Sequence, residues 1–452
     1  MTMKCRVLGS APYTRQALAG AALLIAGTVM GPAAASSGDE RDTSRARNVI
    51  LLVGDGMGDS EITLARNYTV GAGGRLHMDG FPMTGSYTTY SVDRDGRPNY
   101  VTDSAASATA WATGHKTVND RISKTADTDR AVPTILELAR QGGLATGSVT
   151  SAELTDATPA ALTSHVTDRS CQGPADMERC PTDTRAAGGP GSIAEQTVAH
   201  RVDVLLGGGR QRFDQTITQG PERGSTVLQR ARQHGYRVVT DARGLDAVRP
   251  GRPVLGLFAP EELPVAWTGT PAAAGGTAPQ RCVTDREPSD GIPSLEVLTR
   301  KAIALLDARA RQKGAGKGFF LQVEGAAIDK QNHDADPCGQ IGETVAFDRA
   351  VKAAREYAAR HPDTLVITTA DHGHSSQIVP MAARPAGLSA TLITDEGAPM
   401  KVSYATHAGE EGQEHSGVQV RIAAEGPEAH RVLGTTDQTQ LFTTLRIGLN
   451  LR

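Results

Sequence analysis

Three apolar runs of strand length in this chain are each followed within two residues by an acidic residue. They are run 49–53 before Asp55, run 319–323 before Glu324, and run 365–369 before Asp371. A single acidic residue in this position is commonly a helix cap. Three of them, two with further ligand-type side chains nearby, are better explained by a binding site. Because ligands of open α/β sheets bind at the carboxyl ends of the strands, the pattern predicts a polar site at that edge.

The apolar runs alternate with amphipathic stretches of helix length. This alternation predicts an α/β fold around a mostly parallel sheet. Further strands are expected at 145–150, 202–206 and 236–240, and helices at 60–68, 134–141, 226–234, 295–311 and 341–360. Glycine- and proline-rich loops cover 170–192 and 268–293. Segment 376–412 lacks clear periodicity, so we expect a surface excursion there.

The N-terminus has the features of a secretory signal peptide. Basic residues precede the apolar run 17–30, and Ala33, Ala34 and Ala35 come before a polar stretch. This order predicts cleavage after Ala35 and export, to the periplasm or out of the cell. An uncleaved membrane anchor is the alternative, but the run is short for a membrane span and Gly27 interrupts it.

No linker divides the rest of the chain strongly enough to mark a second domain. We therefore expect an N-terminal segment at 36–47 and one large catalytic domain at 48–452 with inserted loops. The whole chain has a net charge of −3, and loss of the signal peptide with its three basic residues would leave −6. Nucleic acid and an anionic membrane are therefore not expected as partners.

The cysteines indicate a disulfide framework. Cys5 lies in the predicted signal peptide, so an even number remains in an exported chain, which suggests two disulfides. Three pairings are open. Because Cys171 and Cys180 flank a loop that could close locally, the predicted pairs are Cys171–Cys180 and Cys282–Cys338. A zinc cluster is the alternative, but the chain has no close Cys-x-x-Cys spacing.

One spacing predicts a metal site. Asp329 and His333 are four residues apart, so on a helical turn both side chains would point to the same side. His415, in a distant segment, could supply a third ligand, although alone it would suggest a surface loop histidine. Two imidazoles and a carboxylate with one open position describe a catalytic zinc site.

A second group of ligands follows the strand at 365–369. Asp371 and His372 are adjacent, and a turn at the strand end would let both reach one ion together with Asp55. A harder ion such as magnesium takes only oxygen ligands. Asp55, Glu324 and a hydroxyl or water from the turn at 156–158 could provide them.

Ser104 is expected at the N-terminus of a helix of small residues, 104–111. There the helix dipole favours an alkoxide or a bound phosphate, although an ordinary helix cap is the simpler interpretation. Arg169 offers a planar fork of donors that matches two phosphate oxygens. Alone, Arg169 would be a solvated loop residue, and Lys330 would be either a phosphate contact or a surface ion pair.

Five motifs resemble those of the bacterial alkaline phosphatases. They are Asn48-Val-Ile-Leu-Leu-Val-Gly-Asp-Gly-Met-Gly-Asp-Ser-Glu61, Thr102-Asp-Ser-Ala-Ala-Ser-Ala-Thr-Ala-Trp111, Glu153-Leu-Thr-Asp-Ala-Thr-Pro159, Val323-Glu-Gly-Ala-Ala-Ile-Asp-Lys-Gln-Asn-His333 and Thr369-Ala-Asp-His372. They occur in the family's order. The resemblance implies a three-layer αβα sandwich with inserted surface loops, and hydrolysis of phosphate monoesters through a phosphoserine.

The resemblance also implies roles for the matching residues. Ser104 would be the nucleophile, Arg169 would bind the substrate phosphate, and Lys330 would act on it through water. The metals would be two zinc ions and one magnesium ion per chain. Their ligands would be Asp329, His333 and His415 for the first zinc, Asp55, Asp371 and His372 for the second, and Asp55, Thr158 and Glu324 for magnesium, whose waters Asp156 would orient.

Other properties follow from the resemblance alone. The two cysteine pairs fall where the family has its disulfides, and the family forms homodimers. The family's Asp156 and Lys330 positions vary, and this pairing favours magnesium over a third zinc. His374 and His407 match no family role, so both are expected to be exposed loop histidines.

Two alternatives remain open at this point. A phosphodiesterase or sulfatase on the same superfamily core would share the metals but differ in its nucleophile. A protein that stores or senses phosphate or zinc would lack the nucleophile or a ligand, and none is missing here. The sequence does not indicate a physiological substrate.

Overall fold

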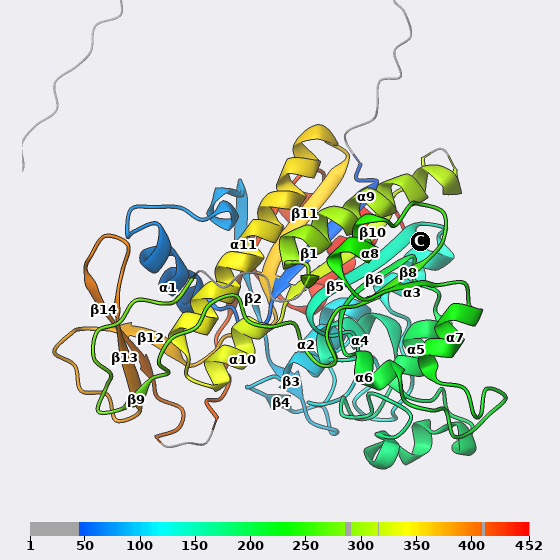
Figure 1. Ribbon diagram of the computed structural model, residues 1–452, viewed down its shortest axis with the longest axis horizontal. Helices are drawn as coiled ribbons and strands as arrows, with labels where there is room; N and C mark the ends of the chain where they lie inside the picture. Colours follow the sequence, from blue (N-terminus) through cyan, green and yellow to red (C-terminus); the bar gives the residue numbers. More distant parts are fainter. Residues whose placement is uncertain (1–44, 285–290, 315, 409–411, 452) are drawn as a thin grey trace, which may run out of the picture. The chain divides into compact units, whose positions relative to one another are not determined.

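The computed structural model describes residues 45–284, 291–314, 316–408 and 412–451. The predicted signal peptide with Cys5, and most of segment 36–47, lie outside the described residues. The described residues all belong to one compact unit, 42–452 (Figure 1). None of the helices in this part of the chain is long and apolar enough to cross a membrane.

A ten-stranded sheet lies at the centre of this unit (Figure 1). Its strands are β1 Asn48–Gly54, β2 Met83–Thr88, β5 Ala145–Glu153, β6 Val204–Gly208, β7 Arg237–Val239, β8 Val254–Leu257, β10 Phe319–Gly325, β11 Thr364–Ala370, β15 Val420–Glu425 and β16 Gly434–Asp437. Their order is β16-β2-β15-β11-β1-β10-β5-β6-β8-β7. Only β15 runs antiparallel to the other strands of this described sheet. The predicted α/β class with a mostly parallel sheet is confirmed.

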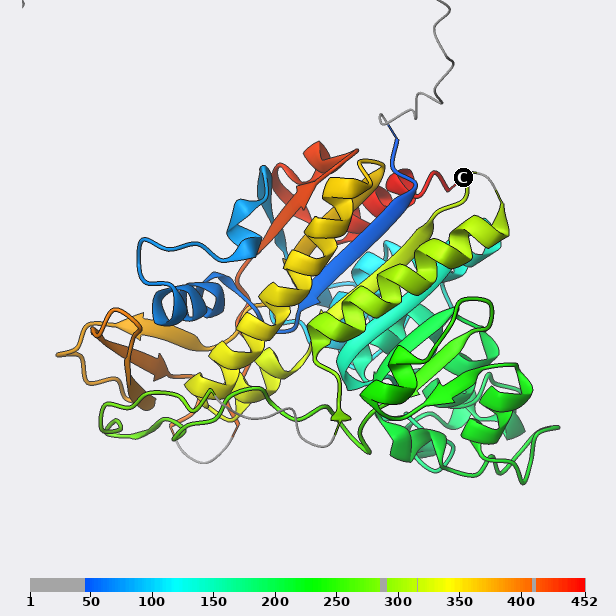
Figure 2. The same cartoon turned by 45° about the horizontal axis from the view of Figure 1, so that its top comes forward.

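Helices cover both faces of the sheet. One face carries α9 (Leu295–Lys313) and α11 (Pro337–Arg360), which Figure 2 shows lying along the strands. The other face carries α2 (Ser104–Thr113), α3 (Ile135–Gln141), α4 (Ala157–Thr163) and α12 (Thr439–Gly448). The remaining α-helices of the described chain are α1 Asp59–Thr69, α5 Ile193–Ala199, α6 Arg210–Phe213, α7 Val227–Gln233, α8 Ala242–Asp246 and α10 Ala327–His333. The three layers are those that the resemblance implied.

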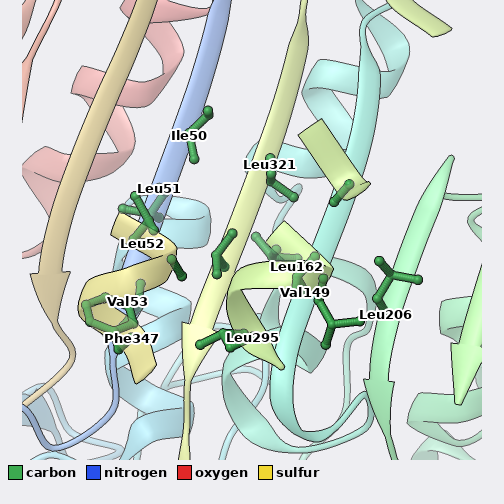
Figure 3. Close-up of a cluster of buried hydrophobic side chains, with 14 of the residues drawn as sticks. Ile50, Leu51, Leu52, Val53, Val149, Leu162, Leu206, Leu295, Leu321 and Phe347 are labelled. Carbon is green, nitrogen blue, oxygen red and sulfur yellow. The ribbon is translucent and has the colours of Figure 1, made fainter. Parts of the chain in front are cut away.

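The hydrophobic core lies on both faces of the central strands. Figure 3 shows side chains of β1 and its neighbours packed with Leu162 of α4, Leu295 of α9 and Phe347 of α11. All seven residues of β1 are buried. A strand that is buried on both faces reads as an unbroken apolar run rather than as an alternating one, which is why β1 was recognisable in the sequence.

The strand register places the acidic residues at one edge. Val53 of β1 pairs with Glu324 of β10 and with Thr369 of β11, and Glu324 pairs with Thr150 of β5. Since β11, β1, β10 and β5 are parallel neighbours, their carboxyl ends lie side by side. The prediction that Glu324 lies just beyond the end of its strand was wrong, because Glu324 is the second-last residue of β10.

The expected helix boundaries hold to within a few residues, and α11 differs most. It begins at Pro337, four residues before the expected start at 341. The Asp336 carboxylate accepts hydrogen bonds from the backbone N–H groups of Cys338 at 2.9 Å and Gly339 at 3.1 Å. A proline at the first helical position loses no intrahelical hydrogen bond. The apolar stripe alone could not reveal this capped first turn.

Segment 376–412 is not the irregular excursion that the sequence suggested. It contains β12 Ser376–Val379, β13 Leu388–Ile393 and β14 Pro399–Tyr404, which join β9 Ala273–Ala274 in a four-stranded antiparallel sheet. These strands are short, and their mixed polar and apolar residues leave no run that marks them. β14 pairs with β12 and β13 of the same segment, and in this described sheet β9 alone comes from elsewhere in the chain. A separate two-stranded sheet is formed by β3 Ser91–Val92 and β4 Pro98–Asn99.

Candidate active site

Ser104 is the first residue of α2, at the edge where the central strands end. Asp103, not Ser104, caps this helix, and its carboxylate accepts a hydrogen bond from the backbone N–H of Ala106 at 2.9 Å. The Ser104 side chain is therefore free of the capping role and is buried. Its Oγ lies 3.3 Å from Nε2 of His372 and 3.5 Å from both carboxylate oxygens of Asp55.

The residues that follow β1 and β11 form one ligand group. Nε2 of His372 lies 3.4 Å from Asp55 Oδ1 and 3.2 Å from Asp371 Oδ2. Asp371 is oriented by hydrogen bonds from the backbone N–H groups of Gly56 at 2.8 Å and His372 at 2.9 Å. The chain thus turns at the end of β11 as expected, and it brings the adjacent Asp371 and His372 to one point.

A second ligand group surrounds Asp329 on α10. The carboxylate of Asp329 lies 3.3 Å from Nε2 of each of three histidines, His333, His374 and His415. The ligand atoms of all four residues lie within 4.8 Å of one another. His374 is buried, so the expectation that it is an exposed loop histidine was wrong. The structure makes it a fourth member of this group.

Backbone carbonyls fix the tautomers of two of the three histidines in this group. Nδ1 of His415 lies 2.9 Å from the carbonyl oxygen of Thr102, and Nδ1 of His333 contacts the carbonyl oxygen of Gln413. Because a carbonyl oxygen only accepts, each Nδ1 carries the proton and each Nε2 presents a lone pair. The two Nε2 atoms lie 3.2 Å apart. Such a backbone partner on the far nitrogen is typical of metal-ligating histidines.

An oxygen-rich group lies on the β5 and β10 side. Glu324 accepts a hydrogen bond from the Thr150 hydroxyl, and the Thr158 hydroxyl of α4 lies beside the same carboxylate. Asp156 caps α4 through the backbone N–H of Ala157 at 2.8 Å. This region offers carboxylate and hydroxyl oxygens and no imidazole, which is the ligand chemistry of a hard cation.

Three carboxyl groups of the site, those of Asp55, Glu324 and Asp371, are not compensated by positive charge from the described residues. Burial raises the pKa of Asp55 well above its ordinary value, and Asp371, Asp329 and Glu324 raise it further. Burial also raises the pKa of Glu324 to about 8 and that of Asp371 to about 6. A positive charge among these groups would reverse the effect, because it favours the ionised carboxylates.

The imidazoles and Asp329 influence one another in opposite directions. Burial lowers the pKa of His372 well below its ordinary value, and His415 lowers it further. Burial alone would raise the pKa of Asp329, but the close contacts of its carboxylate with the imidazoles of His333, His374 and His415 hold it well below its ordinary range. A neutral His372 beside an ionised Asp329 is the protonation state that a metal requires of its ligands.

The ligand sets fit metal ions chemically. Four buried atoms have no hydrogen-bond partner among the described residues, namely Thr158 Oγ1, Asp329 Oδ1, Asp371 Oδ2 and His374 Nε2. Buried polar atoms are normally satisfied, so this concentration of unpaired ligand atoms is what a cation-binding site presents. Imidazole with carboxylate is typical of zinc, and an all-oxygen set is typical of magnesium.

Two cationic side chains lie beside Ser104 and the ligand groups. The Arg169 guanidinium lies 3.3 Å from Asp103 Oδ2 and 2.8 Å from Asp156 Oδ1. Lys330 Nζ lies 3.1 Å from Asp156 Oδ2 and 3.6 Å from Glu262. These partners hold both cations in place, and Arg169 remains partly exposed with a planar fork of donors that suits phosphate oxygens.

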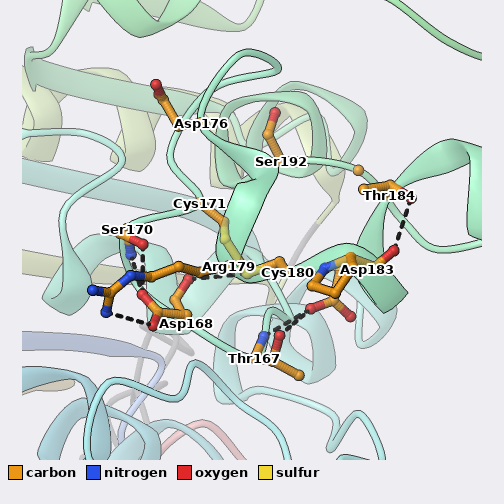
Figure 4. The surroundings of a disulfide bond; sticks show 12 residues. Thr167, Asp168, Ser170, Cys171, Asp176, Arg179, Cys180, Asp183, Thr184 and Ser192 are labelled. Atoms are coloured by element: carbon orange, nitrogen blue, oxygen red, sulfur yellow. Dashed lines mark hydrogen bonds and ion pairs between the residues drawn. A yellow bond between two sulfur atoms is a disulfide. The ribbon is translucent and has the colours of Figure 1, made fainter.

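A disulfide closes the loop that begins two residues after Arg169 (Figure 4). Cys171 and Cys180 are joined, and so are Cys282 and Cys338, as predicted. Figure 4 shows Asp168 accepting from Ser170 and contacting Arg179 next to this bond. The loop at 170–192 is thus anchored immediately after Arg169, which limits how far the guanidinium can move.

The structure brings the predicted site residues together from distant parts of the chain. Ser104, the ligand candidates, Asp156, Arg169 and Lys330 all gather at the carboxyl edge of the sheet. His407 does not join them, since it lies on the surface 3.8 Å from Glu414. Sequence reasoning missed His374 and Thr150. The two-residue spacing of His372 and His374 was the available signal for the former.

Comparison with known sequences gives close relatives. A family model described as alkaline phosphatase matches residues 46–410 and 389–451. The chain is 64% identical over 447 residues to streptomycin-6-phosphate phosphatase of Streptomyces griseus, covering 98% of this chain and 99% of the relative. It is 49% identical over 431 residues to alkaline phosphatase of Escherichia coli (strain K12), covering 93% and 90%.

Solved structures share the fold. The alkaline phosphatase of the Antarctic bacterium TAB5 matches with a TM-score of 0.67 at 24% identity, over 90% of this chain and 99% of that one. The alkaline phosphatase of Thermus thermophilus matches with a TM-score of 0.67 at 21% identity, over 93% and 96%. These similarities support the architecture, whereas the sequence matches identify the family.

Proposed function

Because the chain belongs to the alkaline phosphatase family, we propose that it hydrolyses its substrates through a phosphoserine formed on Ser104. Membership of this family identifies the chain as a metal-dependent phosphoric monoester hydrolase. The observation that carries the assignment to Ser104 is the position of its buried Oγ, between the His372 imidazole and the Asp55 carboxylate. No other hydroxyl of the described site is placed at a helix N-terminus and against both ligands.

The reaction proposed has two displacement steps. In the first, the Ser104 oxygen forms a bond to phosphorus as its proton passes to water, the bond from phosphorus to the leaving oxygen breaks, and the leaving alkoxide takes a proton from water. In the second, a water oxygen forms a bond to phosphorus, the bond to Ser104 breaks, a proton of that water passes through solvent to the Ser104 oxygen, and inorganic phosphate leaves. The N-terminus of α2 favours the negative charge at Ser104 in both steps.

Arg169 is proposed to bind the phosphoryl group. Its guanidinium is oriented by Asp103 and Asp156, so two N–H donors can meet two non-bridging oxygens without further rearrangement. Oriented donors stabilise charge that develops in the transition state more than they stabilise the substrate. Lys330, held by Asp156, would add positive charge through an intervening water.

The metal assignment proposed is two zinc ions and one magnesium ion. Bound there, the ions would supply positive charge that stabilises an alkoxide on Ser104 and the charge on the leaving oxygen. The residues proposed to hold them are Asp329, His333 and His415 for one zinc, Asp55, Asp371 and His372 for the other, and Asp55, Thr158 and Glu324 for magnesium, with Asp156 orienting its waters. The orphaned oxygens of Thr158, Asp329 and Asp371 support this assignment.

The first test is a substrate comparison with controlled metal content. The mature protein is assayed at alkaline pH with an aryl phosphate monoester and its matched diester, before and after chelation. We expect a strong monoester preference that chelation abolishes and that zinc with magnesium restores. A diester preference would move the chain to another branch of the superfamily. Bound metals without turnover would support storage or sensing.

A more specific substrate is suggested by the 64% identity to a streptomycin-6-phosphate phosphatase. Streptomycin carries cationic guanidinium groups. Glu262 lies next to Lys330, and its side chain is 48% exposed, so it offers a carboxylate at the rim of the site. We expect streptomycin 6-phosphate to have a higher kcat/KM than glucose 6-phosphate, and Glu262→Gln to reduce that difference. Equal values for both substrates would indicate a general phosphatase.

Homodimer formation and export are proposed from the family and from the N-terminal pattern. The predicted signal peptide, 1–35, is outside the described residues, so its cleavage needs a direct measurement. Expression in a bacterial host, with N-terminal sequencing of the exported protein, should give Ser36 as the first residue. Light scattering of that protein should give twice the mass of one chain.

A further inference from the structure

A separate, partly open cavity of about 210 Å³ is lined by none of the ligand residues described above. Its walls come from the end of β5, the segment 263–267, the start of α9 and one side of α11. Most of its walls are apolar, including Leu263, Val265, Trp267, Ile292 and Leu295. Since a water molecule takes roughly 30 Å³ in the liquid, the cavity has room for a small organic molecule.

One buried carboxyl group lines this cavity. Glu343 of α11 is 6% exposed, and its one hydrogen bond in the described structure comes from the backbone N–H of Ala266 at 2.7 Å. No described cationic side chain pairs with it. Arg349, the one other ionisable residue among the described cavity walls, is exposed and makes no ion pair with Glu343.

An unpaired carboxylate in such surroundings is unusual. Buried charges are normally paired, and an unpaired one shifts its pKa instead. Burial raises the pKa of Glu343 to about 7, and only the hydrogen bond from Ala266 opposes this. At the alkaline pH at which such an enzyme is assayed, Glu343 would therefore carry a negative charge inside an apolar cavity.

The aromatic wall of the cavity is held in place. Trp267 packs directly on the α11 backbone at Gly342, where an added Cβ would approach the Trp267 side chain to 2.6 Å. Its ring centroid lies 6.1 Å from that of Tyr68. The cavity thus presents a fixed aromatic face and one carboxylate, and both are features that recognise an organic cation.

We propose that this cavity binds a small organic ammonium ion, with its charged group at Glu343 and its apolar body against Trp267 and Val265. The occupant is a primary amine with a short aliphatic or aromatic chain. A neutral molecule of the same size would leave the carboxylate unpaired. A metal ion fits less well, because the walls offer few other oxygen ligands.

The proposal is tested with n-butylammonium as the probe and 1-butanol as its neutral counterpart. The metal-loaded enzyme is first saturated with inorganic phosphate, so that the catalytic site is occupied and its carboxylates do not compete. Binding at pH 8.5 is followed by calorimetry and by tryptophan fluorescence, since the chain has two tryptophans and Trp267 lines the cavity.

We expect saturable binding of n-butylammonium, with at least tenfold lower affinity in Glu343→Gln and unchanged affinity in Glu356→Gln. Glu356 lies on the same helix and its side chain is 38% exposed, so it controls for the loss of one charge. Affinity should also fall between pH 8.5 and pH 6, as Glu343 takes up a proton. Equal affinity for 1-butanol, or full affinity in Glu343→Gln, would overturn the proposal. The comparison with 1-butanol decides it even if Glu343→Gln fails to fold.

Discussion

The Nε2 atoms of His333 and His415 lie 3.2 Å apart, although the two residues are 82 positions apart in the chain. Each ring has its other nitrogen at a backbone carbonyl, so two lone pairs face each other next to the Asp329 carboxylate. A metal ion held by these residues would take a lone pair from each of the two nitrogens, with the Asp329 carboxylate beside it.

His374 should be needed for tight metal binding at Asp329. His374→Ala removes a neighbour that lies 3.3 Å from the Asp329 carboxylate and helps to orient it. Loss of such a supporting contact typically lowers metal affinity by roughly 10- to 100-fold. Zinc affinity is measured by competition with a chelator. His407→Ala should leave it unchanged, and an equal loss in both variants would argue against a specific role.

Ser104→Ala should lose most of the phosphatase activity. Removing a catalytic nucleophile commonly lowers kcat by several orders of magnitude, with a residual rate supplied by the rest of the site. We expect at least about a 1000-fold loss in kcat for an aryl phosphate. Acid quenching with labelled substrate should trap a phosphoserine in the wild type and none in the variant. Full turnover by Ser104→Ala would rule out the covalent route.

Arg169→Ala should weaken phosphate binding in the transition state. A hydrogen bond to a charged group contributes about 1.5–3 kcal/mol, so loss of a two-pronged contact should lower kcat/KM by roughly 100-fold or more. Arg169→Lys should recover only part of this, because an ammonium cannot reproduce the planar fork. The matched control is Arg179→Ala, on the loop that the neighbouring disulfide closes, where the side chain is 72% exposed.

Asp156→His should shift the metal preference of the oxygen-rich group. Asp156 forms ion pairs with both Arg169 and Lys330. Its replacement by histidine would introduce a nitrogen ligand and would break both ion pairs. Metal analysis of the purified variant should show less magnesium and more zinc. An unchanged metal content would contradict the assignment.

Glu343→Gln should stabilise the protein at alkaline pH. The folded state raises the pKa of Glu343 from about 4.5 to about 7, so folding holds a proton more tightly than the unfolded chain does. The contribution of Glu343 to the free energy of unfolding is fully present below about pH 4.5 and is lost as the pH rises through 7. The loss is on the order of 3 kcal/mol. The thermal midpoint of Glu343→Gln should exceed that of the wild type at pH 8.5 and match it near pH 5.

The glutamine variant retains an oxygen for the Ala266 N–H, so this contact does not confound the comparison. Glu356→Gln, on the exposed side of the same helix, should show no such dependence on pH. If Glu343→Gln is equally stable relative to wild type at both pH values, the buried carboxyl is paired in solution, and the proposed ammonium site is weakened with it.

The parts of the fold that could be predicted are those whose signal is local. The run 49–53 and the run 365–369 are buried on both faces, so their apolar composition alone marked them as strands. The strands within 376–404 mix polar with apolar residues, and β13 pairs with β9, a segment more than 100 residues away at 273–274. Their composition carried no comparable mark, because only the pairing makes them strands.

The sequence by itself determined the chemistry of this protein: which carboxylates, imidazoles and cations it has, and that several of them follow buried strands. Only the tertiary structure decided which of them meet. The parallel register brings the carboxyl ends of β11, β1, β10 and β5 to one edge of the sheet. The path of the chain after β11 places His374 beside Asp329, and the loop at 413–416 places His415 there. Spacing along the chain specifies neighbours within a turn of helix or strand, whereas contacts between distant segments depend on how the layers pack.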